Sequence, residues 1–450
     1  MAKKLNTHEL LNEYRWLPNY SEVAKFAANL AKEGENAQAI IKAVNAKFGE
    51  AARVQTFRDK PGPIQVFGEV GKHIPENAYE QLENAMRIPP ARRGAIMPDG
   101  HKGYGVPIGA VVELENAISP GYIGYDISCM LMLTVLDISP EDFMVHREAL
   151  ANDLRAETAF GVGAEFTQPR QHAVMDAPAW EDTKILKTLK GKAASQLGSS
   201  GGGNHFADLV IGEVTENADW LPLAVGKKFV ALMTHSGSRG TGHKLATHYV
   251  KFAENSAKST TRRLPKGHGW LTMDSDLGQE YWHAMTLMGE YSVANHELIH
   301  QHFCERAGIG QKVQYWNRHN YAWLEGDGVI HRKGATPAET GRVGIIPGTS
   351  GTASYLVTGL GNADSLNSSS HGAGRPYSRT EAKRQHNNDG FLKHMKERDI
   401  LFYGIETDET YQAYKDIETV MDVQDGVLVS RVAKLEPKVV IMGGKADDGD

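Results

Sequence analysis

The sequence predicts a single large α+β domain with a mostly antiparallel β core and surrounding helices, together with an N-terminal helical extension. From about residue 64 to residue 440, short β-type runs alternate with glycine-rich turns, and no linker-like segment interrupts them. Helical stretches fall between the runs, but without regular βαβ alternation, so a doubly wound parallel sheet is not favoured. The chain has 450 residues, of which 41% are hydrophobic, and it can therefore bury a large core.

Residues 1–60 are expected to form an amphipathic helical extension that packs on the main body. Apolar residues recur there at helical spacing in two groups: Leu10, Leu11, Tyr14 and Leu17, followed by Val23, Phe26, Ala27 and Leu30. The segment 60–63, Lys-Pro-Gly-Pro, then breaks the helical pattern. The predicted boundaries are 1–60 for the extension and 64–443 for the large domain.

Within the large domain, apolar runs and helical spacing locate the main elements. Five runs are predicted as strands: 108–114, 130–136, 229–233, 343–346 and 439–442. Five stretches are predicted as helices: 141–155, 181–196, 240–260, 278–308 and 380–398.

Composition excludes several classes of protein. No apolar run approaches the roughly 18–20 residues of a membrane-spanning helix, and the first residues lack the apolar stretch of a signal peptide. Two cysteines, Cys129 and Cys304, cannot form a disulfide framework, so we expect a reducing, cytoplasmic compartment and no membrane. The net charge is −6, with 49 basic and 55 acidic residues, so any contact with nucleic acid must depend on a local groove.

Histidines and glycines cluster in the same segments. The first cluster runs from residue 97 to 109 and is followed by Gly-Tyr-Asp-Ile-Ser-Cys at 124–129. Asp126 and Cys129 stand three residues apart just before a predicted strand, so one turn can direct a carboxylate oxygen and a thiolate sulfur at one point. The alternative is a glycine-rich corner with a buried structural cysteine.

Further clusters suggest a site for phosphate groups. The segment 197–208 is rich in glycine, which lets backbone N–H groups approach an anion, although it matches neither a Walker A loop nor a dinucleotide-binding fingerprint. His235 stands at the end of a predicted strand, before small residues that open a helix, and His319-Asn320 leads towards the glycine-rich segment 346–354. His371 has hydroxyl and glycine neighbours and two following arginines, which suits a nucleophile that attacks phosphorus.

One further motif is expected to be a chance match. Residues 296–300 fit H-E-x-x-H, the helical signature of zinc proteases. The metzincin continuation is missing, because Phe303 and Arg306 stand where glycine and histidine belong.

Taken together, these ordered motifs resemble the RtcB family of RNA-splicing ligases over residues 64 to 440. The segments that carry the resemblance are MPDGHKGYGVPIG at 97–109, GYDISC at 124–129, GNHF at 203–206, HSGSRG at 235–240, HN at 319–320, HRKGA at 331–335, PGTSG at 347–351 and HGAGR at 371–375.

The resemblance implies a role for each matching residue. His371 would be the nucleophile that takes GMP from GTP. The implied metal ligands are Asp126, Cys129, His205, His235 and His319. The implied nucleotide contacts are Asn204, His205, Phe206, Asp208, His319, Asn320, Pro347, Gly348, Thr349, Ser350, Ser354, His371, Gly372, Ala373, Gly374 and Tyr414. The residues implied to handle phosphates or RNA ends are Asp99, Arg239, Lys333, Arg375 and Arg379.

The implied activity is the joining of RNA 3′-phosphate or 2′,3′-cyclic phosphate ends to 5′-hydroxyl ends, in RNA repair or tRNA splicing. It would use GTP and two Mn²⁺ ions, with RNA and an archease-like activator as partners. Raw affinity would favour zinc over manganese at such a ligand set, so availability must decide.

The sequence departs from the family pattern at the nucleotide site. Asp208 stands in place of the family's glutamate, and Met442 stands in place of a closing lysine, for which Lys445 is a possible substitute. These changes leave alternatives open: a divergent paralogue with altered nucleotide use or end-capping activity, or a non-catalytic RNA-end sensor. A dinuclear metallophosphoesterase, which needs no GTP, is the remaining alternative.

Overall fold

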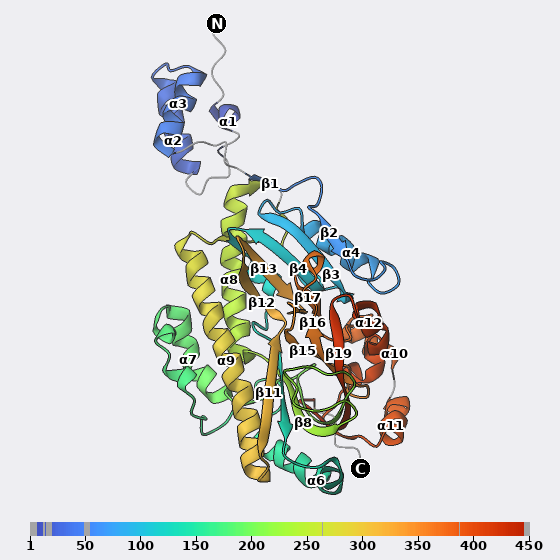
Figure 1. Ribbon diagram of the computed structural model, residues 1–450. Helices are drawn as coiled ribbons and strands as arrows, with labels where there is room; N and C mark the ends of the chain where they lie inside the picture. The colour runs from blue at the N-terminus through green and yellow to red at the C-terminus, as the bar shows by residue number, and fades with distance from the viewer. Residues whose placement is uncertain are drawn as a thin grey trace.

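An eight-stranded sheet forms the larger half of the main body (Figure 1). The computed structural model describes residues 7–11, 14, 20–48, 55–262, 264–386 and 388–444. In order across the sheet, the strands are β11 (Gln311–Arg318), β6 (Met130–Leu136), β8 (Lys228–Ser236), β7 (Phe206–Val214), β19 (Val429–Met442), β16 (Ser354–Gly359) and β15 (Val343–Ile346), and β18 (Leu401–Tyr403) pairs with β19. All pairs are antiparallel except β18 with β19.

A five-stranded sheet lies beside the first. Its order is β12 (Asn320–Glu325), β13 (Gly328–Lys333), β4 (Ile108–Glu115), β3 (Ala91–His101) and β2 (Ile64–Val66), and only β2 pairs in parallel. Three two-stranded ladders complete the pairing: β1 (Gln55–Thr56) with β9 (Thr261–Arg262), β5 (Ala117–Ile118) with β10 (Leu271–Thr272), and β14 (Ala335–Pro337) with β17 (Ser368–Ser370). The predicted α+β class with an antiparallel core is confirmed.

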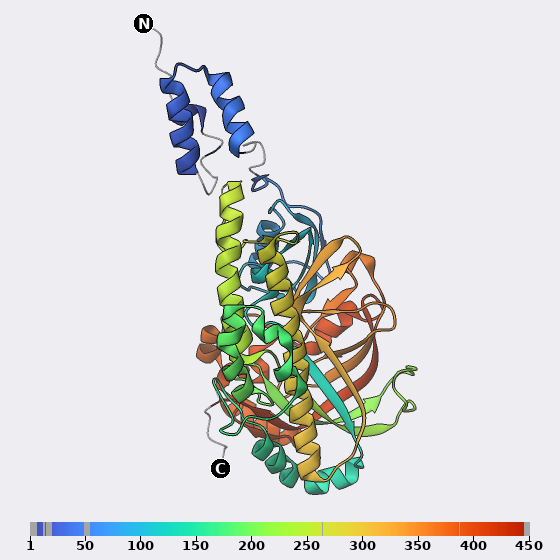
Figure 2. The same ribbon diagram turned by 90° about the vertical axis from the view of Figure 1, so that its left-hand side faces the viewer.

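Helices cover the sheets, and α7 (Lys184–Gln196), α8 (Arg239–Thr260) and α9 (Asp276–Ala307) lie together on one face (Figure 2). The other helices of the main body are α4 (Glu76–Ala85), α5 (Pro120–Ile123), α6 (Pro140–Glu157), α10 (Arg379–Gln385), α11 (Asn388–Glu397) and α12 (Ile417–Gln424). Local signals set their ends. Ser275 caps α9 by accepting from the N–H of Gly278, and Gly308 ends it with φ +65°.

Two of the predicted helices differ from the structure by more than two residues. The helix predicted from residue 181 begins at Lys184, because the Thr183 side chain caps it by accepting from the N–H of Leu186. The helix predicted over 380–398 is two helices, because His386 has extended backbone angles that end α10.

The N-terminal extension packs differently from our expectation. Its helices are α1 (Thr7–Leu10), α2 (Tyr20–Lys32) and α3 (Ala37–Phe48), and Leu17 lies outside the described residues. Val23, Ala27, Ile40 and Val44 are buried in an apolar cluster made only of residues from this extension. Both views place α2 and α3 beyond the end of α8 rather than against the sheets (Figures 1 and 2). The apolar faces of the two helices therefore cover one another instead of the main body.

None of the helices in the described part of the chain is long and apolar enough to cross a membrane.

Replacing Val23 with aspartate should unfold the extension and leave the main body folded. A carboxylate in that apolar cluster loses its hydration without gaining a charged partner. Circular dichroism should show less helix, while the midpoint of the main calorimetric transition stays the same. Lys25→Asp, on the exposed face of α2, is the control. A lower midpoint for Val23→Asp alone would show that the extension supports the body.

Candidate functional site

A cavity of about 360 Å³ lies where the two sheets meet. His319 is the single residue between β11, in the larger sheet, and β12, in the smaller one, so it marks the junction. Cys129 directly precedes β6, and His235 lies near the end of β8. Strand ends from both sheets therefore bring polar side chains from distant parts of the sequence to one place.

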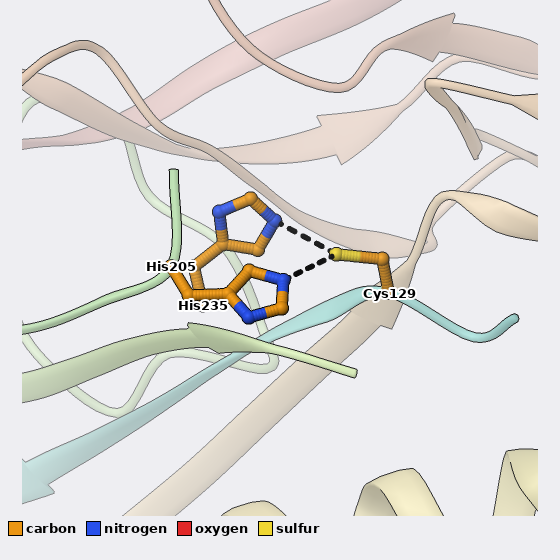
Figure 3. A group of neighbouring side chains, drawn as sticks. All are labelled: Cys129, His205 and His235. Carbon is orange, nitrogen blue, oxygen red and sulfur yellow. Dashed lines mark hydrogen bonds between the residues drawn. The ribbon is translucent and has the colours of Figure 1, made fainter. Parts of the chain in front are cut away.

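Cys129, His205 and His235 form a buried cluster suited to a metal ion (Figure 3). The Sγ atom of Cys129 lies 3.1 Å from Nε2 of His235 and 3.5 Å from Nε2 of His205. Strand register creates this proximity, because His235 pairs with Leu131 on one side and with Phe206 on the other. Those two positions lie close to Cys129 and to His205 in sequence.

Two further predicted ligands complete the cluster. Oδ2 of Asp126 lies 2.9 Å from Nε2 of His205, and Nε2 of His319 lies 3.2 Å from Nε2 of His235. Nδ1 of His235 lies 2.9 Å from the carbonyl oxygen of Asn204, which assigns the proton to Nδ1 and leaves Nε2 free to bind a metal. Oδ1 of Asp126 is buried without a hydrogen-bond partner, so it too has a lone pair to offer.

Burial controls the charge of these groups. It lowers the pKa of His235 and His319 well below the ordinary value, so both rings are neutral, as metal ligands must be. Burial, with the nearby Asp126 carboxylate, raises the pKa of the Cys129 thiol. Burial also acts to raise the pKa of Asp126, but the hydrogen bond and charge of His205, the hydrogen bond from Cys129 and the charge of Arg239 together outweigh it, and the net shift is downward. The oxygen, nitrogen and sulfur donors thus fit a divalent cation.

His371 follows β17 and is held by a buried carboxylate. Its Nδ1 donates to Oδ2 of Asp99 over 2.7 Å, and its backbone N–H donates to the same oxygen over 3.1 Å. Because Nδ1 carries the proton, Nε2 keeps its lone pair. The His371 and His319 rings have centroids 4.9 Å apart, so the free nitrogen belongs to a ring that lies beside the metal-type cluster.

Lys415 fixes the segment that carries Asp99. Its ammonium donates to three carbonyl oxygens, those of His73 (2.7 Å), Pro98 (3.2 Å) and Gly100 (2.8 Å). Burial acts to raise the pKa of Asp99, whereas His371 and Lys415 lower it. The net shift is downward, so the carboxyl stays ionised. Sequence reasoning missed Lys415, which belongs to no motif.

Loops from several parts of the chain form the rest of the cavity wall. Gly374 has φ +73°, and a Cβ atom there would lie 2.2 Å from the carbonyl oxygen of Asp99, so no other residue fits. Asp208 is 4% exposed, and its Oδ1 has no hydrogen-bond partner. Burial raises the pKa of this carboxyl well above its usual range. The carboxyl has a backbone hydrogen bond to Ile441, so it is the remaining oxygen that is left for a ligand to satisfy.

The two arginines after His371 meet a carboxylate that the sequence did not reveal. Nη2 of Arg375 lies 2.6 Å from Oε2 of Glu409, and Arg379 and Tyr414 also bind Glu409. Nη1 of Arg379 lies 3.1 Å from Oδ2 of Asp408. Glu409 lines the cavity but lies in a short 3₁₀ turn without a motif, so only tertiary structure identifies it.

The structure brings most of the predicted site residues to this one cavity. Those that line it are Asp126, Cys129, Asn204, Phe206, Asp208, His235, His319, Asn320, Lys333, Pro347, Gly348, Thr349, Ser350, Ser354, His371, Gly372, Ala373, Gly374, Arg375, Arg379 and Tyr414. His205 does not line the cavity itself but contacts Cys129 and Asp126, which do. Asp99 also lies outside the lining and is hydrogen-bonded to His371. Arg239 is buried beside them and donates to Ser199 Oγ over 3.1 Å.

Both departures from the family pattern, Asp208 and Met442, line the cavity. Lys445, the possible substitute for the lysine that Met442 replaces, lies outside the described residues.

The H-E-x-x-H segment does not form a ligand pair in the described structure. His296 and His300 both hydrogen-bond to Oγ1 of Thr234, over 2.6 Å and 2.7 Å, inside the core. Glu297 is partly exposed and contacts His172 on the other side. The two histidines therefore connect α9 to β8.

Comparison with known proteins decides the family. A family model described as tRNA-splicing ligase RtcB matches residues 81–443, which is most of the chain. This chain belongs to the RtcB family. The match to the RtcB model begins within α4 and leaves α1, α2 and α3 outside it.

Several relatives share almost their whole length with this RtcB chain. The tRNA-splicing ligase RtcB of Methanococcus maripaludis is 29% identical, in an alignment that covers 85% of this chain and 95% of that protein. The RNA-splicing ligase RtcB of Mycobacterium bovis is 30% identical over 81% of this chain and 100% of its own length. The tRNA-splicing ligase RtcB of Thermococcus kodakarensis is 29% identical, with 88% and 96% covered.

Lys333 is a buried cation in the wall of the RtcB cavity. Its Nζ donates to the carbonyl oxygens of Tyr104 and, over 3.5 Å, of Gly121. Burial lowers the pKa of Lys333 to about 7, so its charge is lost just above neutral pH.

This shift predicts a pH-dependent stability. Between a folded pKa of about 7 and an unfolded pKa of about 10.4, the unfolded chain binds a proton that the folded chain lacks. Raising the pH therefore favours folding through this group, by at most about 1.4 kcal/mol per pH unit. The free energy of unfolding of the natural protein should rise relative to that of Lys333→Met between pH 7 and pH 10.

Urea denaturation across this pH range measures the difference, with Lys312→Met, at an exposed position of β11, as the control. A constant difference between the natural protein and Lys333→Met would contradict the prediction.

Proposed function

We propose that this RtcB-family chain is an RNA ligase. It joins RNA 3′-phosphate or 2′,3′-cyclic phosphate ends to 5′-hydroxyl ends through a histidine–GMP intermediate, with GTP and Mn²⁺. The observation that carries the proposal is the His371 ring, which keeps a free Nε2 and lies beside a metal-type cluster in one cavity. The names of the relatives, RNA-splicing and tRNA-splicing ligases, support the choice of RNA as substrate.

The first step is attack by Nε2 of His371 on the α-phosphorus of GTP. A nitrogen–phosphorus bond forms and pyrophosphate leaves. The ring becomes positively charged as it is phosphorylated, and the ionised Asp99 stabilises that charge through Nδ1–H. Asp99 therefore acts on the nucleophile and not on the phosphate, which revises the role that the resemblance implied for it.

The residues that would hold divalent cations are Asp126, Cys129, His205, His235 and His319. When bound, the cations supply positive charge that neutralises phosphate oxygens and orients them for in-line attack. Imidazole and thiolate donors also suit zinc, which binds more tightly than manganese at most sites, so metal availability would decide occupancy.

In the second step GMP passes from His371 to an RNA 3′-phosphate, which arises by hydrolysis of a 2′,3′-cyclic phosphate where the end is cyclic. In the third step the 5′-hydroxyl of the other RNA end attacks this activated phosphate, the new phosphodiester forms and GMP leaves. A phosphate monoester is a poor electrophile, and capping it with GMP supplies the leaving group. An archease-like activator would assist turnover.

The direct test is transfer of label from α-³²P-GTP to the protein in the presence of Mn²⁺. The natural protein should acquire an acid-labile label, and His371→Ala should acquire none. The Asp99→Asn variant should acquire label at least about a thousandfold more slowly than the natural protein, because the ring loses the carboxylate that fixes its tautomer. Arg342→Gln, on the surface near β15, is the control. Label that persists in His371→Ala would refute the mechanism.

Asp208 is the group that would choose the base. Its ionised form accepts two N–H donors, which guanine offers at N1 and N2. Its protonated form offers one donor and one acceptor, which matches N1 and the amino group of adenine. Because burial favours the protonated form, the choice between GTP and ATP should depend on pH.

The ratio of GTP labelling to ATP labelling should therefore rise with pH from 6 to 8.5. Asp208→Asn should give a low ratio at every pH, because its amide also offers one donor and one acceptor. At high pH, the ratio of GTP labelling to ATP labelling should be about tenfold lower in this variant than in the natural protein, since a good bidentate base contact is worth about 1–3 kcal/mol. Effects of pH on His371 or on the metal cancel in the ratio. If the ratio still rose with pH in Asp208→Asn, the assignment of base selection to Asp208 would be contradicted.

Met442 favours a second candidate function, namely the same histidine–nucleotide step with altered nucleotide use. It places a thioether in the cavity wall where the family has a lysine. The same comparison of GTP with ATP tests this alternative.

A further inference from the structure

Helices α7 and α8 concentrate positive charge on one face of an acidic protein. Together they contain seven lysines outside the core and a single acidic residue, Glu254, whereas the whole chain has a net charge of −6. Three lysines of α7 are paired with glutamates from neighbouring segments, so, among the described residues, the lysines of α8 contribute most of the unpaired charge. The two helices lie side by side on the face turned to the viewer in Figure 2. Because the whole chain is acidic, nucleic acid can bind only where basic residues are locally concentrated, and these two helices form such a surface.

Three exposed lysines form a row on α8. Lys244, Lys251 and Lys258 recur every seven residues, or about two helical turns, so they point in one direction. The row spans about 21 Å at the usual helical rise of 1.5 Å per residue. Lys258 pairs with Glu254 over 3.6 Å, whereas Lys244 and Lys251 have no ion pair among the residues that the structure describes.

Aromatic rings connect this row to the cavity. Tyr125 lines the cavity and stacks on His243, with ring centroids 5.3 Å apart and an interplanar angle of 30°. Tyr104 is 37% exposed, its ring lies 5.8 Å from that of Tyr125, and its hydroxyl donates to Oε1 of Glu254 on α8 over 3.5 Å. His243 is exposed and directly precedes Lys244, so the aromatic group ends where the lysine row begins.

We infer that the Lys244–Lys251–Lys258 row and the Tyr104–Tyr125–His243 group bind a single-stranded RNA segment that leads into the cavity. Single-strand sites combine a basic track along the backbone with rings on which bases stack, and both parts are present here in continuity with the reaction site. Charge complementarity selects a polyanion, and the exposed ring selects unpaired bases over a duplex. The inference rests on the proposed function for the identity of the ends, but not for the binding itself.

The test measures binding of a fluorescein-labelled, single-stranded 12-nucleotide RNA by fluorescence anisotropy, without GTP or metal. Lys244→Gln/Lys251→Gln should raise Kd at least fivefold at 50 mM KCl. It should also reduce the slope of log K against log [KCl] by about 1.4, because each lost phosphate contact accounts for about 0.7. Lys227→Gln/Lys228→Gln, at the exposed start of β8, removes the same charge elsewhere and should change neither value. Equal melting midpoints confirm that all variants are folded.

A second pair of variants tests stacking. Tyr104→Leu should raise Kd about tenfold, since base stacking on a ring is worth about 1–3 kcal/mol, whereas Tyr104→Phe keeps the ring and the affinity. A 12-base-pair RNA duplex should compete more weakly than the single strand.

Three results would overturn the inference: no RNA binding by the natural protein, equal losses in the two lysine pairs, or preference for the duplex. Each is independent of the proposed function, because labelling of His371 by GTP is a separate measurement. If GTP did not label His371 but RNA binding still depended on the lysines, the ligase mechanism would be rejected and the RNA-binding inference would stand.

Discussion

The hydrogen bond between the buried Asp99 carboxylate and His371 is the constraint on which the site depends. A charge without solvent is costly unless it is paired and hydrogen-bonded, and here one oxygen accepts two N–H groups from the same residue. Lys415 adds positive charge and ties down the carbonyl groups on both sides of Asp99. The carboxylate thereby joins β3 to the end of β17 and determines which nitrogen of the ring is free.

The metal-type cluster depends on a different constraint, the junction of two sheets. Strand register places His235 beside the strands that follow Cys129 and His205, and the passage from β11 to β12 adds His319. Neutral imidazoles and a buried sulfur leave the Asp126 carboxylate as the negative group of the cluster. A bound cation would supply the compensating charge, so the fold and the electrostatics indicate the same occupant.

Sequence reasoning identified most of the residues that line this cavity, because they stand at strand ends among glycines, where spacing and residue type are both informative. It located most elements, such as β6 and α9, because their apolar patterns are long. It failed where local signals are weak. Glu409 and Lys415 act through residues distant in sequence, and no pattern marks them. The break at His386 and the packing of α2 on α3 depend on tertiary contacts, which a helical period does not encode.

Asp208 shows how one buried carboxyl on a cavity wall can discriminate between ligands. Asp208 faces a wall that includes Phe206, Val440 and Met442, which offer no hydrogen bonds from their side chains. A ligand that displaces water there without satisfying the carboxyl leaves it buried and unpaired, and this penalty exceeds the gain from one more apolar contact. Under the proposed function, selectivity at Asp208 would therefore come from rejecting ligands that lack the matching donors.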